Sequence, residues 1–164
     1  MLLIRYIALT VLVIWLGGMI VLGLLVAPST FGVLQASAPD PGSGRMLAGT
    51  VFGEILRRFH LLAYGCGAIL LACLFIMKFI GPPPQAFVAR AALVTLMLEL
   101  AIYSGVPVSR EITKLQSQVS EPISALSQTD ARRIRFDRLH SLSTTLMTIN
   151  MGLGVVLLYW YVRE

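Results

Sequence analysis

Hydrophobic residues gather in four long runs along the chain, and most charged residues fall between them. The runs cover about residues 2–27, 59–80, 87–106 and 139–162. Each run is long enough to cross a hydrocarbon core of ~30 Å, which takes roughly 20 helical residues. None shows the alternation of a barrel strand, and only helices or closed barrels satisfy their backbone polar groups in lipid. The pattern therefore predicts four transmembrane helices, the first retained rather than cleaved as a signal peptide.

The segments between the runs are more polar, and two of them are predicted to be amphipathic and cytoplasmic, at about residues 44–58 and 108–138. Pro28 and Pro107 are predicted to end the first and third helices, because proline removes a backbone donor and interrupts the helical hydrogen bonds. Thr129 followed by Asp130 predicts an N-cap for a helix that runs into the last span. Together these features predict an all-α fold, a single integral membrane four-helix bundle covering residues 1–164.

The entrances to the second and fourth helices resemble one another. One reads RFHLL at Arg58–Leu62, the other reads RLHSL at Arg138–Leu142, and Pro28 and Pro107 repeat at nearly the same spacing. Parallel repeats of this kind occur in membrane transporters. Two duplicated helical hairpins are therefore one interpretation, and chance similarity is the other.

The composition agrees with a lipid environment. The chain is 57% hydrophobic and 13% charged, with a mean hydropathy of +0.82. Soluble domains carry about a quarter charged residues. The sequence also lacks the phosphate-binding, dinucleotide-binding, zinc-protease and nucleophile-elbow motifs of soluble enzymes. We therefore expect a membrane protein that is not an enzyme.

The net charge of +5 is distributed unevenly between the two ends of the predicted helices. One end holds Arg5, Lys78, Arg90 and Arg163. The other end holds Arg45, Arg57, Arg58, Arg110, Lys114, Arg132, Arg133, Arg135 and Arg138. By the positive-inside rule this predicts cytoplasmic long loops and outside termini, in a bacterial inner membrane. No basic patch is interleaved with aromatic residues, so we expect no nucleic-acid partner.

A polar centre is predicted within the membrane. Its proposed members are Glu99, Asn150, Tyr103, Thr144 and Thr148. An ionisable group at membrane depth is a functional-site hypothesis. Glu99 could make a neutral hydrogen bond to Asn150 or Tyr103, or it could handle protons or cations. On the last helix we expect the hydroxyl side to face the other helices and the leucine side, with Leu146, to face lipid.

The two histidines of the chain, His60 and His140, are each predicted about one turn inside the cytoplasmic boundary. With Asp137 they form a hypothetical site for a divalent metal, because imidazole and carboxylate groups are common metal ligands. The alternatives are buried hydrogen-bonding caps and a pH-sensing role. No other cofactor is predicted. Close helix packing is expected at Gly17, Gly18, Gly65 and Gly67, where small residues let helices approach.

Two long stretches resemble a known family. They are WLGGMIVLGLLVAPSTFGVLQ at Trp15–Gln35 and FDRLHSLSTTLMTINMGLGVVLL at Phe136–Leu158, supported by AGTVFGEILRRFH at Ala48–His60. They resemble the transmembrane protein 205-like family, whose bacterial members are described as a domain of unknown function. The resemblance implies a four-helix integral membrane protein and carries over no reaction, cofactor or catalytic residue.

Two functions remain open at this point. The first is a small polytopic membrane protein that handles metal ions or protons in a transport-like manner. Four helices rarely enclose a conducting path alone, so this function would require a homo-oligomer. The second is a structural or assembly partner of a membrane complex, whose polar groups serve packing. In both cases the lipid bilayer is the immediate environment.

Overall fold

Four long helical segments make up the computed structural model, which describes residues 2–80, 84–119 and 123–163. The first segment consists of α1 (Leu2–Val21), the π-helical turn η1 (Leu22–Val26) and α2 (Ala27–Ser37), and the second is α3 (Pro41–Ile80). The third consists of α4 (Phe87–Tyr103), the π-helical turn η2 (Ser104–Val108) and α5 (Ser109–Ser117). A 3₁₀ turn, η3 (Ile123–Ala125), precedes the last segment, α6 (Ala131–Val162). The prediction of an all-α fold with four long helices is confirmed.

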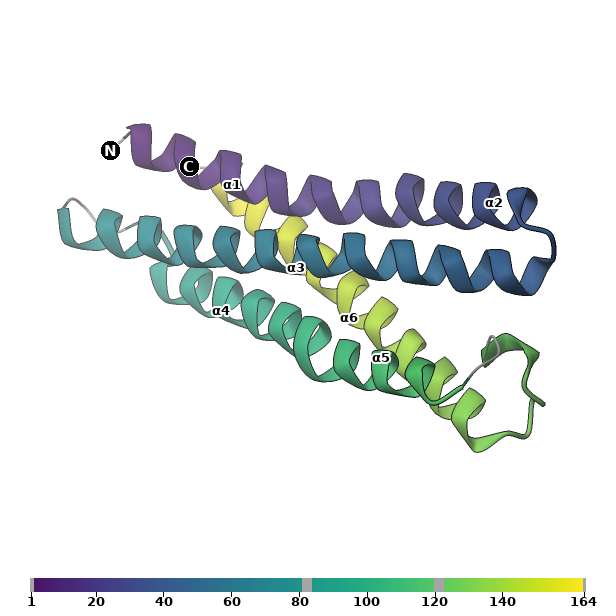
Figure 1. Cartoon of the computed structure of the whole chain (residues 1–164). Coiled ribbons are helices and arrows are strands. Elements are labelled where there is room, and N and C mark those ends of the chain that lie inside the picture. Colours follow the sequence, from purple (N-terminus) through teal and green to yellow (C-terminus); the bar gives the residue numbers. More distant parts are fainter. Residues whose placement is uncertain (1, 81–83, 120–122, 164) are drawn as a thin grey trace.

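The helices pack as a ring of four neighbours. Both α1 and α4 contact α3 and α6, so α3 and α6 stand on opposite corners of the bundle. Figure 1 shows the two termini at one end of the molecule, and the α2–α3 turn and the segment between α5 and α6 at the other. The nine basic residues of the predicted cytoplasmic side therefore lie in the half of the bundle toward the α2–α3 turn.

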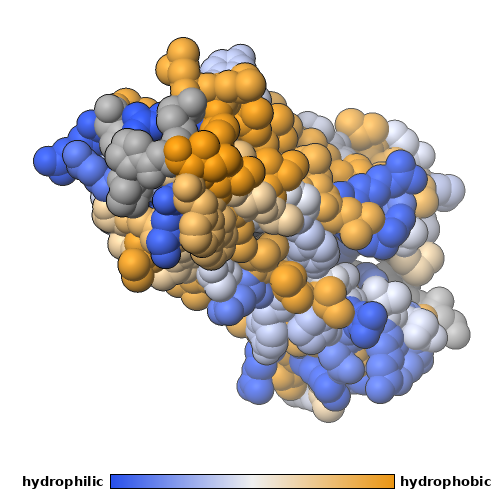
Figure 2. Space-filling model, turned by 90° about the vertical axis from the view of Figure 1, so that its left-hand side faces the viewer, coloured by the Kyte–Doolittle hydropathy of each residue, from blue (hydrophilic) through white to orange (hydrophobic). Residues whose placement is uncertain are grey.

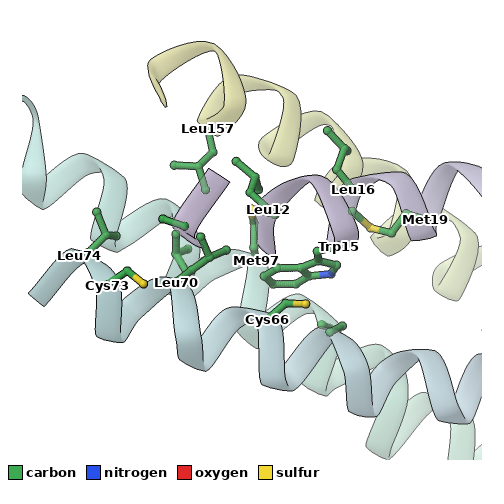
Figure 3. Close-up of a cluster of buried hydrophobic side chains, with 14 of the residues drawn as sticks. Leu12, Trp15, Leu16, Met19, Cys66, Leu70, Cys73, Leu74, Met97 and Leu157 are labelled. Atoms are coloured by element: carbon green, nitrogen blue, oxygen red, sulfur yellow. The ribbon is translucent and has the colours of Figure 1, made fainter. Parts of the chain in front are cut away.

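The core is built from apolar side chains of all four long helices. Trp15 and Leu12 of α1, Leu70 of α3, Met97 of α4 and Leu157 of α6 are completely buried. Figure 3 shows these side chains converging between the helices, together with the buried thiols of Cys66 and Cys73. Burial of large apolar groups in lipid gains mainly van der Waals contact, because lipid tails are as apolar as leucine.

The outer surface is also hydrophobic, which distinguishes the chain from a soluble bundle. Leu24 on η1, Phe79 on α3, Val88 on α4 and Val155 on α6 are all exposed. Figure 2 shows hydrophobic residues over much of the face in view, with hydrophilic residues in separate groups. The four segments are each long and apolar enough to cross a membrane. The chain is therefore a multi-pass membrane protein.

Neither Pro28 nor Pro107 ends its helix, so this expectation is wrong. Each proline lies beside or inside a π-helical turn: Pro28 stands in the first turn of α2 directly after η1, and Pro107 lies inside η2. A π-helical turn shifts the backbone register, and a proline at the start of a helical stretch loses no hydrogen bond that the stretch would have made. The first and third segments therefore continue to Ser37 and Ser117.

The prediction of an N-cap before the last helix is confirmed. Asp130 is the N-cap residue of α6, and its side chain accepts a hydrogen bond from the backbone N–H of Arg132. The two hairpins also begin with the same order of elements, a long helix, a π-helical turn and a short helix, but the second has the 3₁₀ turn η3 before its last long helix. The duplication of one hairpin stays a prediction.

Candidate functional site

His60 lies on α3 against the π-helical turn η2. Its Nδ1–H donates to the backbone carbonyl of Leu56 over 2.9 Å, and the residue is only 9% exposed. Gly105 of η2 packs directly on it, since a Cβ atom at Gly105 would lie 2.6 Å from Cγ of His60. Tyr64, one turn along α3, donates to the carbonyl of Ala101 over 3.4 Å. Together His60 and Tyr64 fix the π-helical turn to α3.

Asn150 is the polar side chain that α6 places in the interior. It is 4% exposed, and its Nδ2 donates to the backbone carbonyl of Met97 on α4 over 2.9 Å. Its Oδ1 is buried and has no hydrogen-bond partner among the described residues. Two turns before Asn150 on α6, the hydroxyl of Ser143 lies 3.2 Å from that of Ser104 in η2. Asn150 and Ser143 thus join α6 to the third segment.

These polar groups line one small cavity between the helices, of about 30 Å³. His60, Ser104, Ser143 and Asn150 provide its polar lining. The remaining walls are apolar and include Trp15, Met19, Leu56, Phe59, Ala63, Leu100, Ala101, Leu146 and Met147. The cavity therefore lies where all four long segments meet, and its volume is far below that of a typical ligand pocket.

The three residues of the hypothetical metal site do not come together. His140 is exposed and stacks on Phe136 with a ring separation of 6.2 Å, whereas His60 is buried. Asp137 is exposed and has Arg133 as its neighbour at 4.0 Å. Within the described ranges no group of three or more His, Cys, Asp or Glu residues could hold a metal ion. The physical reason is the rotation of α6, which directs His140 and Asp137 away from α3.

Two threonines of the hydroxyl side of α6 face outward, contrary to expectation, whereas Ser143 faces the third segment. Thr144 and Thr148 are exposed, and each donates to a carbonyl of its own helix, those of His140 and Thr144 at 3.1 and 2.9 Å. Leu146, expected to face lipid, is buried in the cavity wall. Back-bonded threonines are satisfied without a partner helix, so helix packing is decided by Leu146 and Asn150 instead.

Glu99 lies on the outside of the bundle. Thr95, Glu99 and Tyr103 are exposed at four-residue intervals along α4, and we call these three residues the outer face of α4. On a helix, Glu99 projects almost opposite to the buried Met97. Glu99 makes no hydrogen bond or ion pair within the described part of the chain, and Asn150, one of its two expected partners, is bonded to Met97 instead. The predicted polar centre is therefore split between an inner cavity and an outer face.

Arg90 is buried, although the charge distribution only placed it among the basic residues at one end of the predicted helices. It is 2% exposed, its Nη2 donates to the carbonyl of Trp160 over 2.8 Å, and its guanidinium lies 5.1 Å from the centre of the Tyr161 ring. A cation at a helix C-terminus is favoured by the helix dipole. The charge of Arg90 is visible in the sequence, but its partner is a backbone carbonyl, which no side-chain pattern reveals.

The four glycines expected at helix contacts divide into two pairs. A Cβ at Gly18 would lie 2.5 Å from the Phe59 ring, and one at Gly67 would lie 2.9 Å from Leu98. Gly17 and Gly65 have nothing within 4 Å. Residues one or two positions apart on a helix point in different directions, so on each helix only one of the two glycines meets a neighbour.

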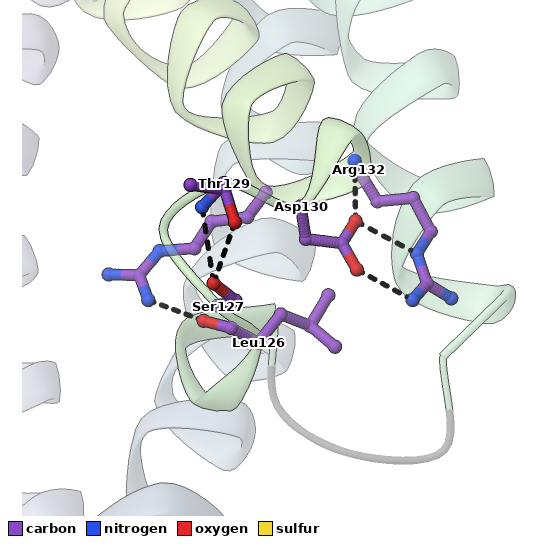
Figure 4. A network of polar contacts seen from close by, with 6 residues as sticks. Leu126, Ser127, Thr129, Asp130 and Arg132 are labelled. Atoms are coloured by element: carbon purple, nitrogen blue, oxygen red, sulfur yellow. Dashed lines mark hydrogen bonds and ion pairs between the residues drawn. The ribbon is translucent and has the colours of Figure 1, made fainter.

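Charged groups form local networks at the basic end of the bundle. Figure 4 shows Asp130 held by Arg132, with a side-chain ion pair at 2.8 Å beside the backbone cap. These hydrogen bonds lower the pKa of Asp130 from 3.8 to about 2. Arg135 of α6 pairs with Glu111 of α5 at 2.7 Å, which joins the two polar helices.

A family model described as Domain of unknown function (DUF4149) matches residues 10–121 of the chain. The match covers most of the first helical segment and the whole of the second and third, with His60, Glu99 and both π-helical turns. No curated protein matches the chain, and no solved structure matches it. The comparisons therefore assign a family without assigning an activity.

Proposed function

The chain belongs to the DUF4149 family, a domain of unknown function, and we propose that it is an assembly component of a membrane complex, bound to its partner through the outer face of α4. The partner is either a second copy of the chain or another membrane protein. This function needs no reaction centre, and it gives a role to Glu99, a polar residue on the surface that the protein presents to the membrane.

The observation that carries the proposal is the exposed position of Glu99. It stands 12 residues after the start of α4 at Phe87, so about 18 Å of helix separates it from that end of the span. An acidic side chain near the middle of a bilayer costs ~2.5–3.5 kcal/mol on insertion scales and normally faces protein or water. Within one chain Glu99 faces neither, so a partner surface would remove this cost.

The alternative of proton handling has one observation in its favour, the buried polar cavity with His60 and Asn150. Its small volume and the distance of Glu99 from it argue against a path through one chain. Metal handling has less support, since the predicted ligands His60, His140 and Asp137 are separated. The transport-like function would therefore require sites formed between subunits.

The position in the membrane is part of the proposal. The basic end of the bundle, with the α2–α3 turn and the segment between α5 and α6, would be cytoplasmic, and both termini would be outside. The membrane would be the bacterial inner membrane. A relationship to the transmembrane protein 205-like family is supported by the stretches at Trp15–Gln35 and Phe136–Leu158.

Particle mass tests the proposal. Protein extracted from membranes in a mild detergent or in native nanodiscs should have a mass above that of one chain, and Glu99→Leu should reduce it to that of one chain. Thr148→Leu is the matched control, because Thr148 is an exposed polar residue already bonded within its own helix. Equal masses for the wild type and Glu99→Leu, measured by native mass spectrometry, would contradict the proposal.

A further inference from the structure

We propose that the small cavity between the helices binds a water molecule, which donates a hydrogen bond to Oδ1 of Asn150 and joins α6 to His60 of α3. This inference concerns the interior of one chain and is independent of the proposed partner. It assigns a role to the buried polar groups that assembly through α4 leaves unused.

The side-chain amide of Asn150 has an unsatisfied hydrogen-bond acceptor. Oδ1 of Asn150 is buried, and the described residues offer it no donor. A buried carbonyl oxygen without a hydrogen bond costs ~1–3 kcal/mol, and more where the surroundings are apolar. The amide orientation is fixed by the opposite end of the group, since Nδ2 donates to the carbonyl of Met97. Turning the amide over would set two acceptors against each other.

The cavity provides both the space and the polar lining that a water molecule needs. A water molecule needs a cavity of roughly 10–15 Å³ and two to four polar partners. The cavity of about 30 Å³ meets the first requirement. His60, Ser104 and Ser143, which line it with Asn150, meet the second. A purely apolar cavity of this size would stay empty, whereas this one has four polar residues in its wall.

The hydrogen bond of His60 decides which of its two ring nitrogens can accept a hydrogen bond. Because Nδ1–H of His60 donates to the carbonyl of Leu56, the neutral ring presents Nε2 as an acceptor. A water molecule has two protons, and it can donate one to Asn150 and the other to His60 while accepting from a serine hydroxyl. Such a water would link α3 and α6, which stand on opposite corners of the bundle and contact each other less than they contact their neighbours.

The chain offers an unusually clean probe for this site, because Asn150 is its only asparagine. Protein labelled with [15N]asparagine, in lipid nanodiscs or bicelles, gives one side-chain amide signal. Magnetisation transfer from water to the two Nδ2 protons should be detected for the wild type. It should be lost in Ala63→Val, since Ala63 is 1% exposed and lines the cavity, so the added methyl groups occupy the water position.

Two further variants keep the test decisive. Ala68→Val places the same change on the exposed side of α3 and should leave the transfer unchanged. If Ala63→Val does not fold, Ala101→Val fills the cavity from another wall. Absence of transfer in the folded wild type would overturn the proposal. Transfer that persists in a folded cavity-filled variant would also overturn it, because exchange through the serine hydroxyls would then explain the signal.

Discussion

At the scale of single residues, the buried charge of Arg90 stabilises the end of the last helix. The guanidinium reaches the carbonyl of Trp160 and stacks near Tyr161, so it satisfies a terminal acceptor and packs an aromatic ring. A hydrogen bond to a charged group contributes ~1.5–3 kcal/mol, more than a neutral one. Arg90 therefore anchors α4 to the C-terminal turn of α6.

Replacing Arg90 by glutamine should lower the free energy of unfolding by about 1.5–3 kcal/mol, because the charge-assisted bond and the stacking contact are both lost. The measurement is reversible unfolding in mixed micelles. Arg163→Gln, a change of the same type at an exposed position beside the same turn, should have no measurable effect. Equal losses in the two variants would show that the Trp160 contact does not stabilise the helix end.

Asp130 makes a pH-dependent contribution to the start of α6. Its hydrogen bonds to Arg132 lower its pKa from 3.8 to about 2. A lowered pKa means that the contribution is complete above about pH 4 and is lost as the pH falls through about 2. A 13C-carboxyl NMR titration should follow this ionisation directly, and Arg132→Ala should raise the pKa toward the ordinary value. A pKa of Asp130 that Arg132→Ala leaves unchanged would refute the ion pair as its cause.

At the scale of elements, the sequence predicts the four helices but not the π-helical turns within two of the helical segments. Hydrophobic run lengths predicted the four helices, because lipid requires about 20 apolar residues for each span. The extension of the helices beyond Pro28 and Pro107 could not be predicted, because proline usually ends a helix. The π-helical turns beside the prolines have no recognisable pattern in the sequence. Helix rotation limited the site in the same way: Asn150 was recognised as polar, but its partner, the Met97 carbonyl, carries no side-chain signal.

The paired glycines of α1 give a sensitive test of helix packing. Gly18→Ala should destabilise the protein by ~1–3 kcal/mol, since its Cβ would meet the Phe59 ring at 2.5 Å. Gly17→Ala should be neutral or stabilising by up to ~1 kcal/mol, because Gly17 has open space and alanine favours the helix. Thermal unfolding of both variants under one set of conditions compares them. Destabilisation by both to the same degree would contradict the packing of α1 on α3.

At the scale of the whole molecule, the uneven charge of the two ends predicts how the bundle stands in the membrane. A reporter that is active only in the cytoplasm should be silent when fused to the C-terminus and active when inserted between α5 and α6. The physical reason is the excess of basic residues at the end that holds these segments. Strong activity from the C-terminal fusion would reverse the orientation and leave the fold unchanged.

The group that covers Glu99 in the membrane decides whether the outer face of α4 serves assembly. The cavity is lined by side chains of all four long segments, whereas the outer face of α4 presents a carboxyl group where lipid would otherwise lie. A protein partner at this face would explain why the polar stripe is exposed. Lipid at this face would leave Glu99 without a role in assembly.

Site-specific photo-crosslinking in intact membranes tests this most directly. A benzophenone amino acid at Thr95, beside Glu99 on the outer face of α4, should form a protein adduct of discrete mass that decreases strongly in Glu99→Leu. The same probe at Ile69, an exposed position of α3, should react with lipid. Lipid adducts alone at Thr95, or a protein adduct indifferent to Glu99, would contradict the account.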